Sequence, residues 1–432
     1  MSTVGGGESD AAVQVTAENW QSPPFNRWAF WHVKEILPAL PIPRRTGPSR
    51  ELIPANAPTV VTDVTLASVD GSVVTAGQVM ADTYTDAYVV MQDGALVAEW
   101  YAPEGAPDRT HAVMSISKSV VGCVVAALVD RNLLDTDRLV TEYVPELAAS
   151  GYAGATVRHV LDMRSGVRFR EDYLDPDAEV AVLARWISQE PLPGEASPGG
   201  IYRYLVGLSG EAPHGQRFLY RSAETDVLGW VCERAAGKPM AELISTLIWQ
   251  PLGAEFDAEI ICDGLGTAVH DGGMCATARD LARFGQMLLD GGSIPDEGND
   301  ERTVIGSRWL RDAWAVDADA RSVFVASPAE VSMPGGWYRN QFWFRPGPYG
   351  DVLLCQGIYG QLVHVTRRTH TVCVKLSSWP DPQNPVYSQN TLRAFDAIAG
   401  ALAGRPAAGE NPRQPGVIAG LSRHGKSDRS GK

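Results

Sequence analysis

The chain has 432 residues, of which 44% are hydrophobic and 20% are charged, as in an ordinary soluble globular protein. Its formal net charge of −14 argues against a nucleic-acid partner, because phosphate binding needs a clustered basic surface. The N-terminus lacks the basic and apolar regions of a secretory signal, and no apolar run reaches the length of a membrane span. We therefore expect a cytoplasmic protein without a nucleic-acid or membrane partner.

The six cysteines do not form any C-x-x-C pair, and most of them lie in apolar runs. No histidine and cysteine residues stand at the close spacing that a zinc site needs. The sequence therefore predicts buried, reduced thiols and no metal site.

In chain order, residues 1–20 are small and polar, which predicts a flexible N-terminus. Residues 25–40 carry apolar side chains at helical spacing and predict a helix that ends before Pro41 and Pro43. Residues 87–102 contain two strand-like runs around Asp93-Gly94, which predicts a β-hairpin.

The next stretch, HAVMSISKSVVGCVVAALVDRNLLDTD at 111–137, predicts a helix after Ser115 that is apolar on nearly every side and therefore buried. Mostly helical patterns follow up to residue 320. In the last of them, Thr277 is the expected N-cap and Gly291 the stop signal. The predicted helices of this region lie at 156–163, 178–189, 223–237 and 277–292.

Strand patterns return near the end of the chain, and a final helix is expected at 390–402 with Asn390 as its cap. The predicted strands lie at 341–347, 351–366 and 371–379, and Gly357 and Gly360 interrupt the middle one.

Strand patterns at both chain ends and helices between them predict an α+β fold, in which an antiparallel sheet flanked by helices carries an inserted helical lobe. We assign 21–134 and 321–403 to the lobe with the sheet, 135–320 to the mainly helical lobe, and 404–432 to a disordered tail.

The pair Ser115 and Lys118 suggests chemistry, because residues i and i+3 share one face of a helix. A serine hydroxyl becomes a good nucleophile only when a base accepts its proton, and burial is expected to lower the pKa of Lys118 for that role. The helix N-terminus also favours negative charge beside Ser115. The alternative is a capping serine with a solvated lysine, although a lysine just before an apolar helix is not expected to be freely solvated.

A second candidate element is Tyr220-Arg221-Ser222, on a turn before a predicted helix. A tyrosine beside an ammonium group has a lowered pKa and can relay a proton. The third is the glycine-interrupted strand at 351–366, whose N–H groups can hold an oxyanion.

Taken in this order, Ser-x-x-Lys, Tyr-x-Ser and the glycine-containing strand resemble the serine β-lactamase and penicillin-binding-protein superfamily, with a spacing similar to its class C branch. Within it, the chain looks like the 6-aminohexanoate-dimer hydrolase-like group of β-lactamase-related serine hydrolases. The resemblance covers roughly residues 22–402. It is carried by the segments FNRWAFWHVKEILP, SISKSVVG, SGVRFREDYLDPDAEV, GGMCATARDLARFG and GIYGQ.

The resemblance implies roles for five residues. Ser115 matches the nucleophile, Lys118 the lysine of its proton network, and Tyr220 the tyrosine that acts as general base and then as general acid. Tyr173 matches a second pocket tyrosine that steadies the leaving amine or the intermediate, with ordinary loop packing as its alternative. Ser222 stands where class C enzymes carry asparagine, which weakens a β-lactamase assignment.

The same comparison implies an oxyanion hole. Cys355-Gln356-Gly357 stands where the superfamily has Lys-Thr-Gly, so the basic residue that recognises a carboxylate is missing. The N–H groups of Ser115 and Ile358 match the two oxyanion donors. If the alignment slips by three residues, Gln361 takes the place of Ile358 as the second donor. With either donor, Ser222, Tyr359 and Gln361 are expected to contact the substrate.

Other residues have weaker signals. His111 or His270 would serve a Ser-His-Asp triad, but no G-x-S-x-G elbow is present. Packing or loop roles are the simpler expectation for the remaining candidates, although each could line a pocket. The acidic run at 170–179 is expected to be a solvated loop, with attraction of a substrate amine as the alternative. The candidates that could line a pocket are His270, Asp271, Trp186, Trp337 and Tyr338.

The expected reaction is transfer of an acyl group to water, with an ester or linear amide as the small-molecule substrate and without a metal or organic cofactor. A β-lactamase or D-Ala-D-Ala peptidase is the alternative enzyme, and a non-catalytic binding protein on the same fold is the alternative of another class. The sequence leaves open the physiological substrate and whether the chain forms a homodimer.

Overall fold

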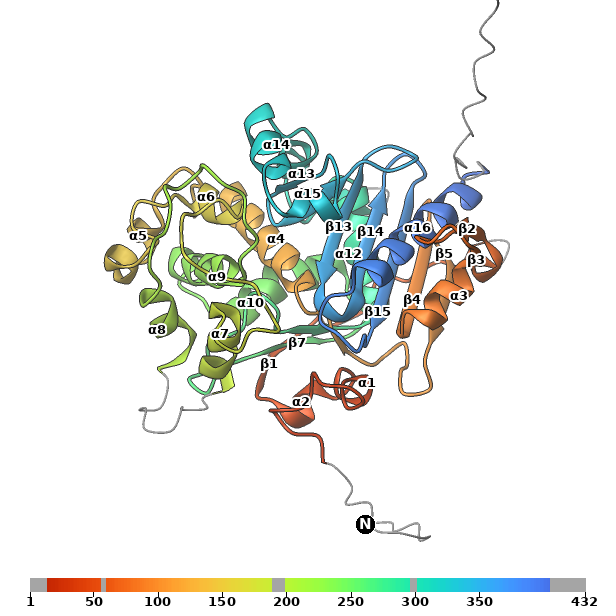
Figure 1. Cartoon of the computed structure of the whole chain (residues 1–432), viewed down its shortest axis with the longest axis horizontal. Coiled ribbons are helices and arrows are strands. Elements are labelled where there is room, and N and C mark those ends of the chain that lie inside the picture. Colours follow the sequence, from red (N-terminus) through yellow and green to blue (C-terminus); the bar gives the residue numbers. More distant parts are fainter. Residues whose placement is uncertain (1–13, 56–59, 189–198, 296–300, 405–432) are drawn as a thin grey trace, which may run out of the picture.

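The structure is a computed structural model, which describes residues 14–55, 60–188, 199–295 and 301–404. Its largest sheet has seven strands in the order β11-β12-β13-β14-β15-β4-β5, and every neighbouring pair is antiparallel. β4 and β5 come from the first part of the chain and the other strands from its end, so the α+β fold with a sheet built from both chain ends is confirmed (Figure 1). The strands are β4 (Thr85–Gln92), β5 (Ala95–Tyr101), β11 (Trp337–Arg339), β12 (Phe342–Arg345), β13 (Val352–Gly357), β14 (Gln361–Thr366) and β15 (Thr371–Ser377).

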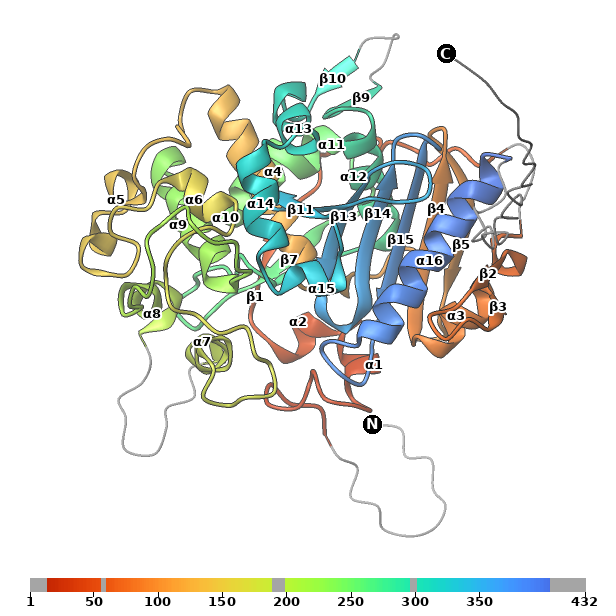
Figure 2. The same ribbon diagram turned by 45° about the horizontal axis from the view of Figure 1, so that its top comes forward.

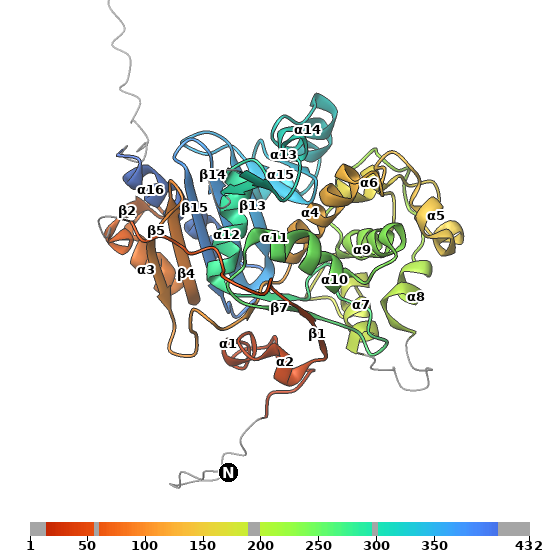
Figure 3. The ribbon, with the colours of Figure 1, turned by 180° about the vertical axis from the view of Figure 1, so that it is seen from behind.

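Helices cover both faces of this sheet. α16 (Pro385–Leu402) and α3 (Ala76–Asp82) lie on one face, where Phe395 shares a buried cluster with Leu354 and Cys373. α12 (Ala278–Leu289) lies on the other face, as the views from front and back show (Figures 1 and 3). The sheet is therefore buried on both sides.

α12 corrects one sequence-based boundary. The prediction places 277–292 in the helical lobe at 135–320, whereas the helix packs against β15, β14 and β4. A Cβ atom built on Gly285 would lie 2.5 Å from Val372 and 3.0 Å from Val363, so glycine allows the helix to approach the sheet closely. Local periodicity predicts the helix, with Thr277 confirmed as its N-cap, but it does not predict which surface the helix packs on.

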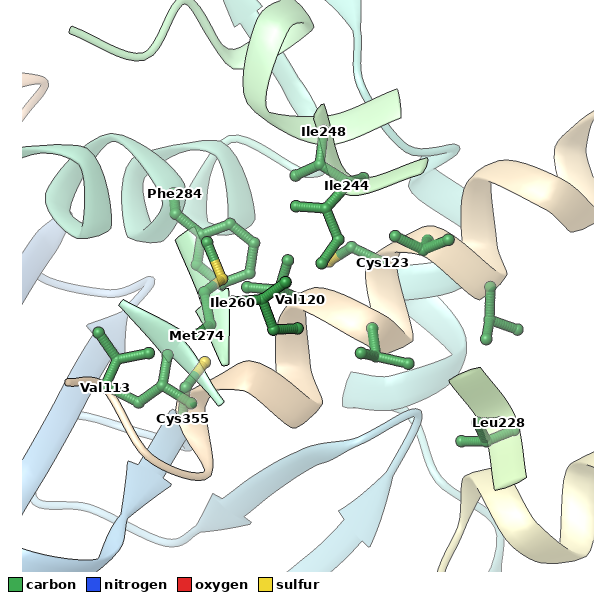
Figure 4. Packing of buried hydrophobic residues seen from close by; sticks show 14 of the residues in the cluster. Val113, Val120, Cys123, Leu228, Ile244, Ile248, Ile260, Met274, Phe284 and Cys355 are labelled. Carbon is green, nitrogen blue, oxygen red and sulfur yellow. The ribbon is translucent and has the colours of Figure 1, made fainter. Parts of the chain in front are cut away.

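The helical region lies beside the sheet and is centred on α4 (Ile116–Asp130), which is buried along nearly its whole length as predicted. Figure 4 shows Val120 and Cys123 of α4 among side chains from six other elements. Those neighbours are Leu228, Ile244, Ile248, Ile260, Met274 and Phe284. The surrounding helices are α5 (Val140–Tyr143), α6 (Val157–Leu161), α7 (Glu179–Ser188), α8 (Gly200–Val206), α9 (Ser222–Ala236), α10 (Met240–Ile244) and α11 (Gln250–Leu252), with a π-helical turn at Ser245–Trp249.

A second sheet underlies both regions, with the order β1-β7-β8-β6. Its strands are β1 (Ala39–Ile42), β7 (Ala258–Ile261), β8 (Met274–Ala276) and β6 (His111–Ala112). β6 leads directly into Ser115, so its pairing with β8 fixes the entry to α4. The remaining elements are β2 (Thr65–Ala67), β3 (Val73–Thr75), β9 (Ser293–Pro295), β10 (Glu301–Thr303), α13 (Ser307–Trp314), α14 (Ala318–Val325) and α15 (Ala329–Ser332).

The predicted helix at 25–40 is wrong as a single element. It is divided into α1 (Asn26–Ala29) and α2 (Val33–Ile36), and Ala39 already begins β1. The carbonyl of Phe30 accepts a hydrogen bond from the N–H of Ala112, 2.8 Å away, which is a tertiary contact that a continuous helix would not allow. β1 is an edge strand, which explains how it tolerates Pro41.

Two further local predictions are corrected. The final helix is capped by Asn384, whose side chain accepts from the N–H of Tyr387, and Pro385 occupies the first turn. Asn390 lies inside the helix and accepts instead from the N–H of Val69. The glycine-interrupted strand at 351–366 is in fact a hairpin, because a 3₁₀ turn at Ile358–Gly360 separates β13 from β14.

Other expectations are confirmed. The hairpin of β4 and β5 turns at Asp93 and Gly94, which have positive φ angles of 50° and 79°. All six cysteines are free and buried. None of the described helices combines the length and the apolar character that crossing a bilayer requires.

The predicted chain ends, 1–20 and 404–432, lie mostly outside the described residues. Trp20, at the inner edge of the first, is packed, because its ring lies edge-on to Phe30 with 5.7 Å between the ring centroids.

The sheet contains a buried lysine. Lys375 lies between Val374 and Leu376 in β15, and its side chain is 0% exposed. Its ammonium group donates to the carbonyl of Thr83 at 3.0 Å and to the hydroxyl of Ser377. Burial lowers the pKa of Lys375 to about 7, against an opposing contribution from Asp86.

We expect Lys375→Met to stabilise the protein at pH 6, by about 2 kcal/mol, because the wild type must bury a charge at that pH. Between pH 7 and 10 the unfolded lysine binds more protons than the folded one, so the stability of the wild type rises with pH relative to the variant. Denaturant unfolding at pH 6 and pH 9 checks this, with the exposed Lys34→Met as control. An equal difference between wild type and Lys375→Met at both pH values would contradict it.

Candidate active site

Ser115 stands where β6 meets α4, in a sharply turned segment. Met114, the residue before it, has a positive φ of 48°, and Ser115 occupies the N-cap position of α4 without capping it. The hydroxyl of Ser117 donates to the carbonyl of Met114 at 2.7 Å and accepts from the N–H of Met274 at 3.1 Å. These two bonds fix the turn without involving the hydroxyl of Ser115. Ser115 itself lines the pocket.

Lys118 lies one turn along α4 and is 1% exposed. Its Nζ atom is 2.9 Å from Ser115 Oγ and 3.1 Å from Ser222 Oγ. It also donates to the carbonyl of Asp271 at 2.7 Å, and the carboxylate of Asp271 lies 3.5 Å away. The predicted pairing of Ser115 with Lys118 is therefore present, and the alternative of a solvated lysine is excluded.

The charge state of Lys118 differs from the expectation. Burial acts to lower the pKa of this lysine, but the acidic groups of Tyr220, Asp271, Glu171 and Asp226 outweigh it and raise the pKa above its ordinary value. Lys118 therefore remains an ammonium ion at neutral pH. It is suited to donating hydrogen bonds and stabilising anions, and not to accepting the proton of Ser115.

Tyr220 lies just before α9 and faces the same ammonium group, with 5.2 Å between Lys118 Nζ and the centre of its ring. The ring packs against Trp343 at a centroid distance of 5.1 Å. Burial raises the pKa of Tyr220, and Lys118 and a hydrogen bond to Ser115 oppose this effect. The structure thus brings Ser115, Lys118 and Tyr220 together as predicted, and a phenolate at Tyr220 would have its counter-ion beside it.

Glu171 connects the polar residues Ser222 and Tyr173. The sequence pattern does not single out Glu171, because it predicts a solvated loop for the acidic run at 170–179. Its carboxylate accepts from Ser222 Oγ at 2.5 Å, from Ser222 N at 2.9 Å and from Tyr173 OH at 2.6 Å. Burial raises the pKa of Glu171, and Lys118 is the largest opposing contribution. The charge of the REDY stretch was visible, but nothing local distinguishes Glu171 from its exposed neighbour Asp172.

Tyr173 and Ser222 take different places in this arrangement. Tyr173 lines the pocket, as predicted, and is held by Glu171. Ser222 is 2% exposed and does not line the pocket. It bridges Lys118 to Glu171, so its expected contact with substrate is corrected to a supporting position behind Tyr220.

Asp226 ties the loop that carries Asp271. Its Oδ1 atom accepts from the N–H of His270 at 3.0 Å and from that of Asp271 at 3.2 Å. Burial and the nearby Asp271 raise the pKa of Asp226. This buried carboxylate on α9 positions the Asp271 carbonyl that Lys118 contacts.

The end of β13 lies directly against Ser115. A Cβ atom on Gly357 would be 2.7 Å from the carbonyl oxygen of Val113 and 3.0 Å from the nitrogen of Ser115, so a side chain has no room there. Ile358 follows Gly357 and lines the pocket beside Ser115. Within the described residues, the N–H of Ser115 has no hydrogen-bond partner and is available to a ligand.

Gln361 and Tyr359 differ from the expectation. Gln361 lines the pocket, but its Nε2 atom donates to the Ser377 carbonyl at 2.6 Å and its Oε1 accepts from Ser377 N at 3.1 Å. Its backbone pairs with Gly357 in the β13–β14 ladder, which also disfavours the slipped alignment. Tyr359 has a positive φ of 60° and packs edge-on against Phe30, outside the pocket lining. Both residues therefore hold the turn, and Tyr359 is not a substrate contact.

The pocket has a volume of about 710 Å³, and Ser115 is one of the residues that line it. That size is ordinary for a small-molecule site. Its lining comes from the helical region, from the end of β13, from residues 327–334 around α15 and from residues 382–391 at the start of α16. The lining includes Glu171, Tyr173, Tyr220, Trp343, Gln356, Gly357 and Ile358.

The weaker candidates lie elsewhere. His111 bonds Asp86 and His270 bonds Tyr202, and neither histidine lines the pocket. Trp186 packs on Tyr204 with a centroid distance of 5.6 Å. Trp337 and Tyr338 are buried and do not line the pocket, so packing accounts for all of these aromatic residues. Tyr338 packs behind the pocket wall, with its ring centroid 6.1 Å from that of Tyr220 and 4.9 Å from that of Trp343.

Comparison with known proteins agrees with this geometry. A family model described as Beta-lactamase matches residues 74–397. The 6-aminohexanoate-dimer hydrolase of Paenarthrobacter ureafaciens is 38% identical over 375 residues, which cover 86% of this chain and 90% of that protein. Esterase EstB of Burkholderia gladioli is 28% identical over 165 residues, which cover 34% of this chain and 37% of the esterase.

A solved structure from Bacillus anthracis, provisionally described as a 6-aminohexanoate-dimer hydrolase, superposes with a TM-score of 0.82. It is 26% identical and covers 92% of this chain and 100% of its own. The matched family model spans most of the chain, including every residue of the Ser115 network. The chain therefore belongs to the beta-lactamase family and is a serine hydrolase related to 6-aminohexanoate-dimer hydrolase.

Proposed function

We propose that this protein hydrolyses carboxylic esters and linear amides, of the 6-aminohexanoate oligomer type, through an acyl-enzyme on Ser115. One observation carries the proposal: Ser115 Oγ lies 2.9 Å from the buried ammonium of Lys118 and beside Tyr220, and Ser115 lines a pocket of about 710 Å³. A hydroxyl, a proton carrier and a fixed cation in contact are the parts that acyl transfer requires. Esterase and amide-hydrolase names among the relatives support the substrate classes.

In acylation, Tyr220 accepts the proton of Ser115 as Oγ attacks the carbonyl carbon. The raised pKa of Tyr220 makes its phenolate a minor but strongly basic species, and the neighbouring ammonium of Lys118 limits the cost of forming it. Lys118 keeps its own proton throughout, because its pKa is also raised. The charge of Lys118 stabilises first the phenolate and then the developing transition state.

The carbonyl oxygen becomes an oxyanion, which the N–H groups of Ser115 and Ile358 accommodate. Contact between Gly357 and the Ser115 segment brings these two backbone positions together. Backbone donors that are already in place need no reorganisation when the charge develops.

Collapse of the intermediate breaks the bond to the alcohol or amine, which leaves with the proton that Tyr220 carries. Water then attacks the ester of Ser115, giving its proton to Tyr220, and the acid product leaves as Ser115 regains its hydrogen. No atom beyond substrate and water is consumed. Tyr173 lines the pocket close to Tyr220 and can steady the leaving group.

The alternatives have less support. At the position of the Lys-Thr-Gly lysine, Cys355 is 0% exposed and cannot bind a substrate carboxylate as a β-lactamase or peptidase would. A non-catalytic binding protein would not need an ammonium group buried against a serine hydroxyl, which costs stability.

Ser115→Ala should abolish both turnover and covalent labelling, because no other hydroxyl in the network is free to attack. Intact-mass spectrometry after fluorophosphonate treatment, with p-nitrophenyl acetate and 6-aminohexanoate-dimer assays, measures this. Ser119→Ala is the matched control, since this serine lies one turn on and bonds the Gln341 carbonyl at 2.8 Å. An adduct that persists in Ser115→Ala would exclude Ser115 as the nucleophile.

Gly357→Ala should lower kcat about a hundred-fold with a smaller change in KM, because a Cβ atom would push β13 away from Ser115 and misplace an oxyanion donor. Gly272→Ala is a suitable control, since its Cβ atom would approach Met114 only to 3.9 Å. Steady-state kinetics would test this, with circular dichroism to establish that both variants fold. Equal activities of the two folded variants would count against the backbone oxyanion hole.

The acidic limb of the pH profile should depend on Glu171. Because its pKa is raised, kcat/KM should fall as the pH drops, with a midpoint above 4.5, as protonation removes the acceptor of Ser222 and Tyr173. Glu171→Gln should lower activity at pH 7 about ten-fold and flatten this limb. Profiles from pH 4 to 9 measure it, and the adjacent exposed Asp172→Asn should keep the wild-type shape. A limb that is unchanged in Glu171→Gln would assign the titration to another group.

A further inference from the structure

A buried ion pair lies next to Tyr220 and takes no part in the proton transfers of the proposed mechanism. Arg221 follows Tyr220 directly and is 1% exposed, and Glu224, in the first turn of α9, is 0% exposed. The Nη1 atom of Arg221 donates to Oε1 of Glu224 at 3.0 Å. Neither residue lines the pocket, so the pair acts from behind the pocket wall and does not meet a substrate there.

The guanidinium group of Arg221 also reaches back past Tyr220. Its Nη1 atom donates to the carbonyl of Leu219 at 3.2 Å, so the residue after Tyr220 bonds the residue before it. The N–H of Leu219 donates to the carbonyl of Met163 at 3.0 Å, and the N–H of Arg221 donates to the Sδ atom of Met163 at 3.4 Å. The backbone on both sides of Tyr220 is therefore fixed, which restricts the positions that its ring can take.

Glu224 joins this segment to the loop that follows α6. Its Oε1 atom accepts from the hydroxyl of Ser165 at 2.5 Å, and Ser165 Oγ accepts in turn from the N–H of Val167 at 3.3 Å. The same loop continues to Glu171 and Tyr173, which line the pocket. Glu224 thus helps to hold together the two segments that carry Tyr173 and Tyr220.

The pair costs free energy that simple packing would not require. Arg221 Nε and Glu224 Oε2 are buried and have no hydrogen-bond partner among the described residues. A second acidic side chain, that of Glu211, is 39% exposed and lies 3.8 Å from Arg221 Nη2, so it does not satisfy these atoms. Well-packed apolar residues are often at least as stabilising as a buried ion pair. Fixed placement of Tyr220 explains what the charges achieve at this position.

We propose that Arg221 and Glu224 are positioning residues, which hold the hydroxyl of Tyr220 in place for proton transfer. The inference rests on the proposed function of Ser115 and adds two residues that act on the reaction without touching the substrate. The phenol of Tyr220 is hydrogen-bonded to Ser115, and a small displacement of a group that transfers a proton slows the chemical step strongly. Tyr220 carries the proton in acylation and in deacylation, so both steps should slow together. The pair should therefore affect kcat and leave KM nearly unchanged.

A second buried pair provides a matched control. Arg283 and Asp280 of α12 have the same spacing of three residues, the same exposed fractions of 1% and 0%, and an Nη1–Oδ1 distance of 2.9 Å. Figure 2 shows α9 among the helices of the helical region, whereas α12 lies against the large sheet. The control pair does not line the pocket. It therefore reports what the loss of a buried ion pair does to this protein when Tyr220 is not beside it.

Steady-state kinetics with p-nitrophenyl acetate test the proposal. Arg221→Lys removes the planar group that bonds Leu219 and Glu224 together, and Glu224→Gln removes the charge that holds it. Each should lower kcat about ten-fold or more, with less than about a two-fold change in KM. Arg283→Lys and Asp280→Asn should leave both constants near their wild-type values. Circular dichroism establishes which variants fold, and either folded variant of the Arg221 pair is sufficient for the comparison.

A Tyr220→Phe background separates positioning from a general loss of structure. In that background the hydroxyl that the pair positions is absent. Adding Glu224→Gln should then change the residual kcat less than about two-fold, although the same substitution lowers the wild-type kcat about ten-fold. A defect that spreads through the fold would instead lower kcat by the same factor in both backgrounds.

Wild-type kcat in folded Arg221→Lys or Glu224→Gln, a loss no larger than in the α12 variants, or equal effects of Glu224→Gln with and without the Tyr220 hydroxyl would overturn the proposal. In each of these cases the wild type still turns over the ester and is labelled by fluorophosphonate at Ser115, so the proposed hydrolase function would stand. Absence of turnover and labelling in the wild type itself would instead remove the hydrolase function on which the positioning role depends.

Discussion

A single buried ammonium group organises the active site. Lys118 donates to Ser115, to Ser222 and to the carbonyl of Asp271, and these residues come from α4, from α9 and from the loop before β8. An unpaired charge in this position would cost several kcal/mol, so the surrounding elements are constrained to supply its partners. Tyr220 and the carboxyl groups of Asp271, Glu171 and Asp226 answer that requirement, and together they raise the pKa of Lys118.

The protonation of Lys118 decides how the chemistry is divided. With the lysine fixed as a cation, the proton of Ser115 must move to another group, and Tyr220 is the phenol in contact with both. Glu171 stands behind this pair and bonds Ser222 and Tyr173, so it couples the network to the wall of the pocket.

The architecture converts this local cluster into a site with a defined approach. α4 is buried along nearly its whole length, so Ser115 at its start is anchored to the core. Gly357 lets β13 touch the Ser115 turn, and Gln361 fastens the next strand to β15. The nucleophile is therefore fixed by the core on one side and by the sheet on the other.

The sequence by itself determined the features that depend on neighbours in the chain. The spacing of Ser115 and Lys118, the apolar helix after them, the Asp93-Gly94 hairpin and the Thr277 cap follow from periodicity, turn chemistry and capping, which act over a few residues. The order of motifs was sufficient for the fold class and for Tyr220. Tertiary structure alone decided the rest, because the deciding partners are distant in sequence. Asp271 and Glu171 raise the pKa of Lys118 from 153 and 53 positions away, the Ala112 contact breaks the helix at Phe30, and Gly285 directs α12 onto the sheet. A charge in a pattern such as REDY does not reveal whether it will be solvated or buried, since that depends on what the fold places against it.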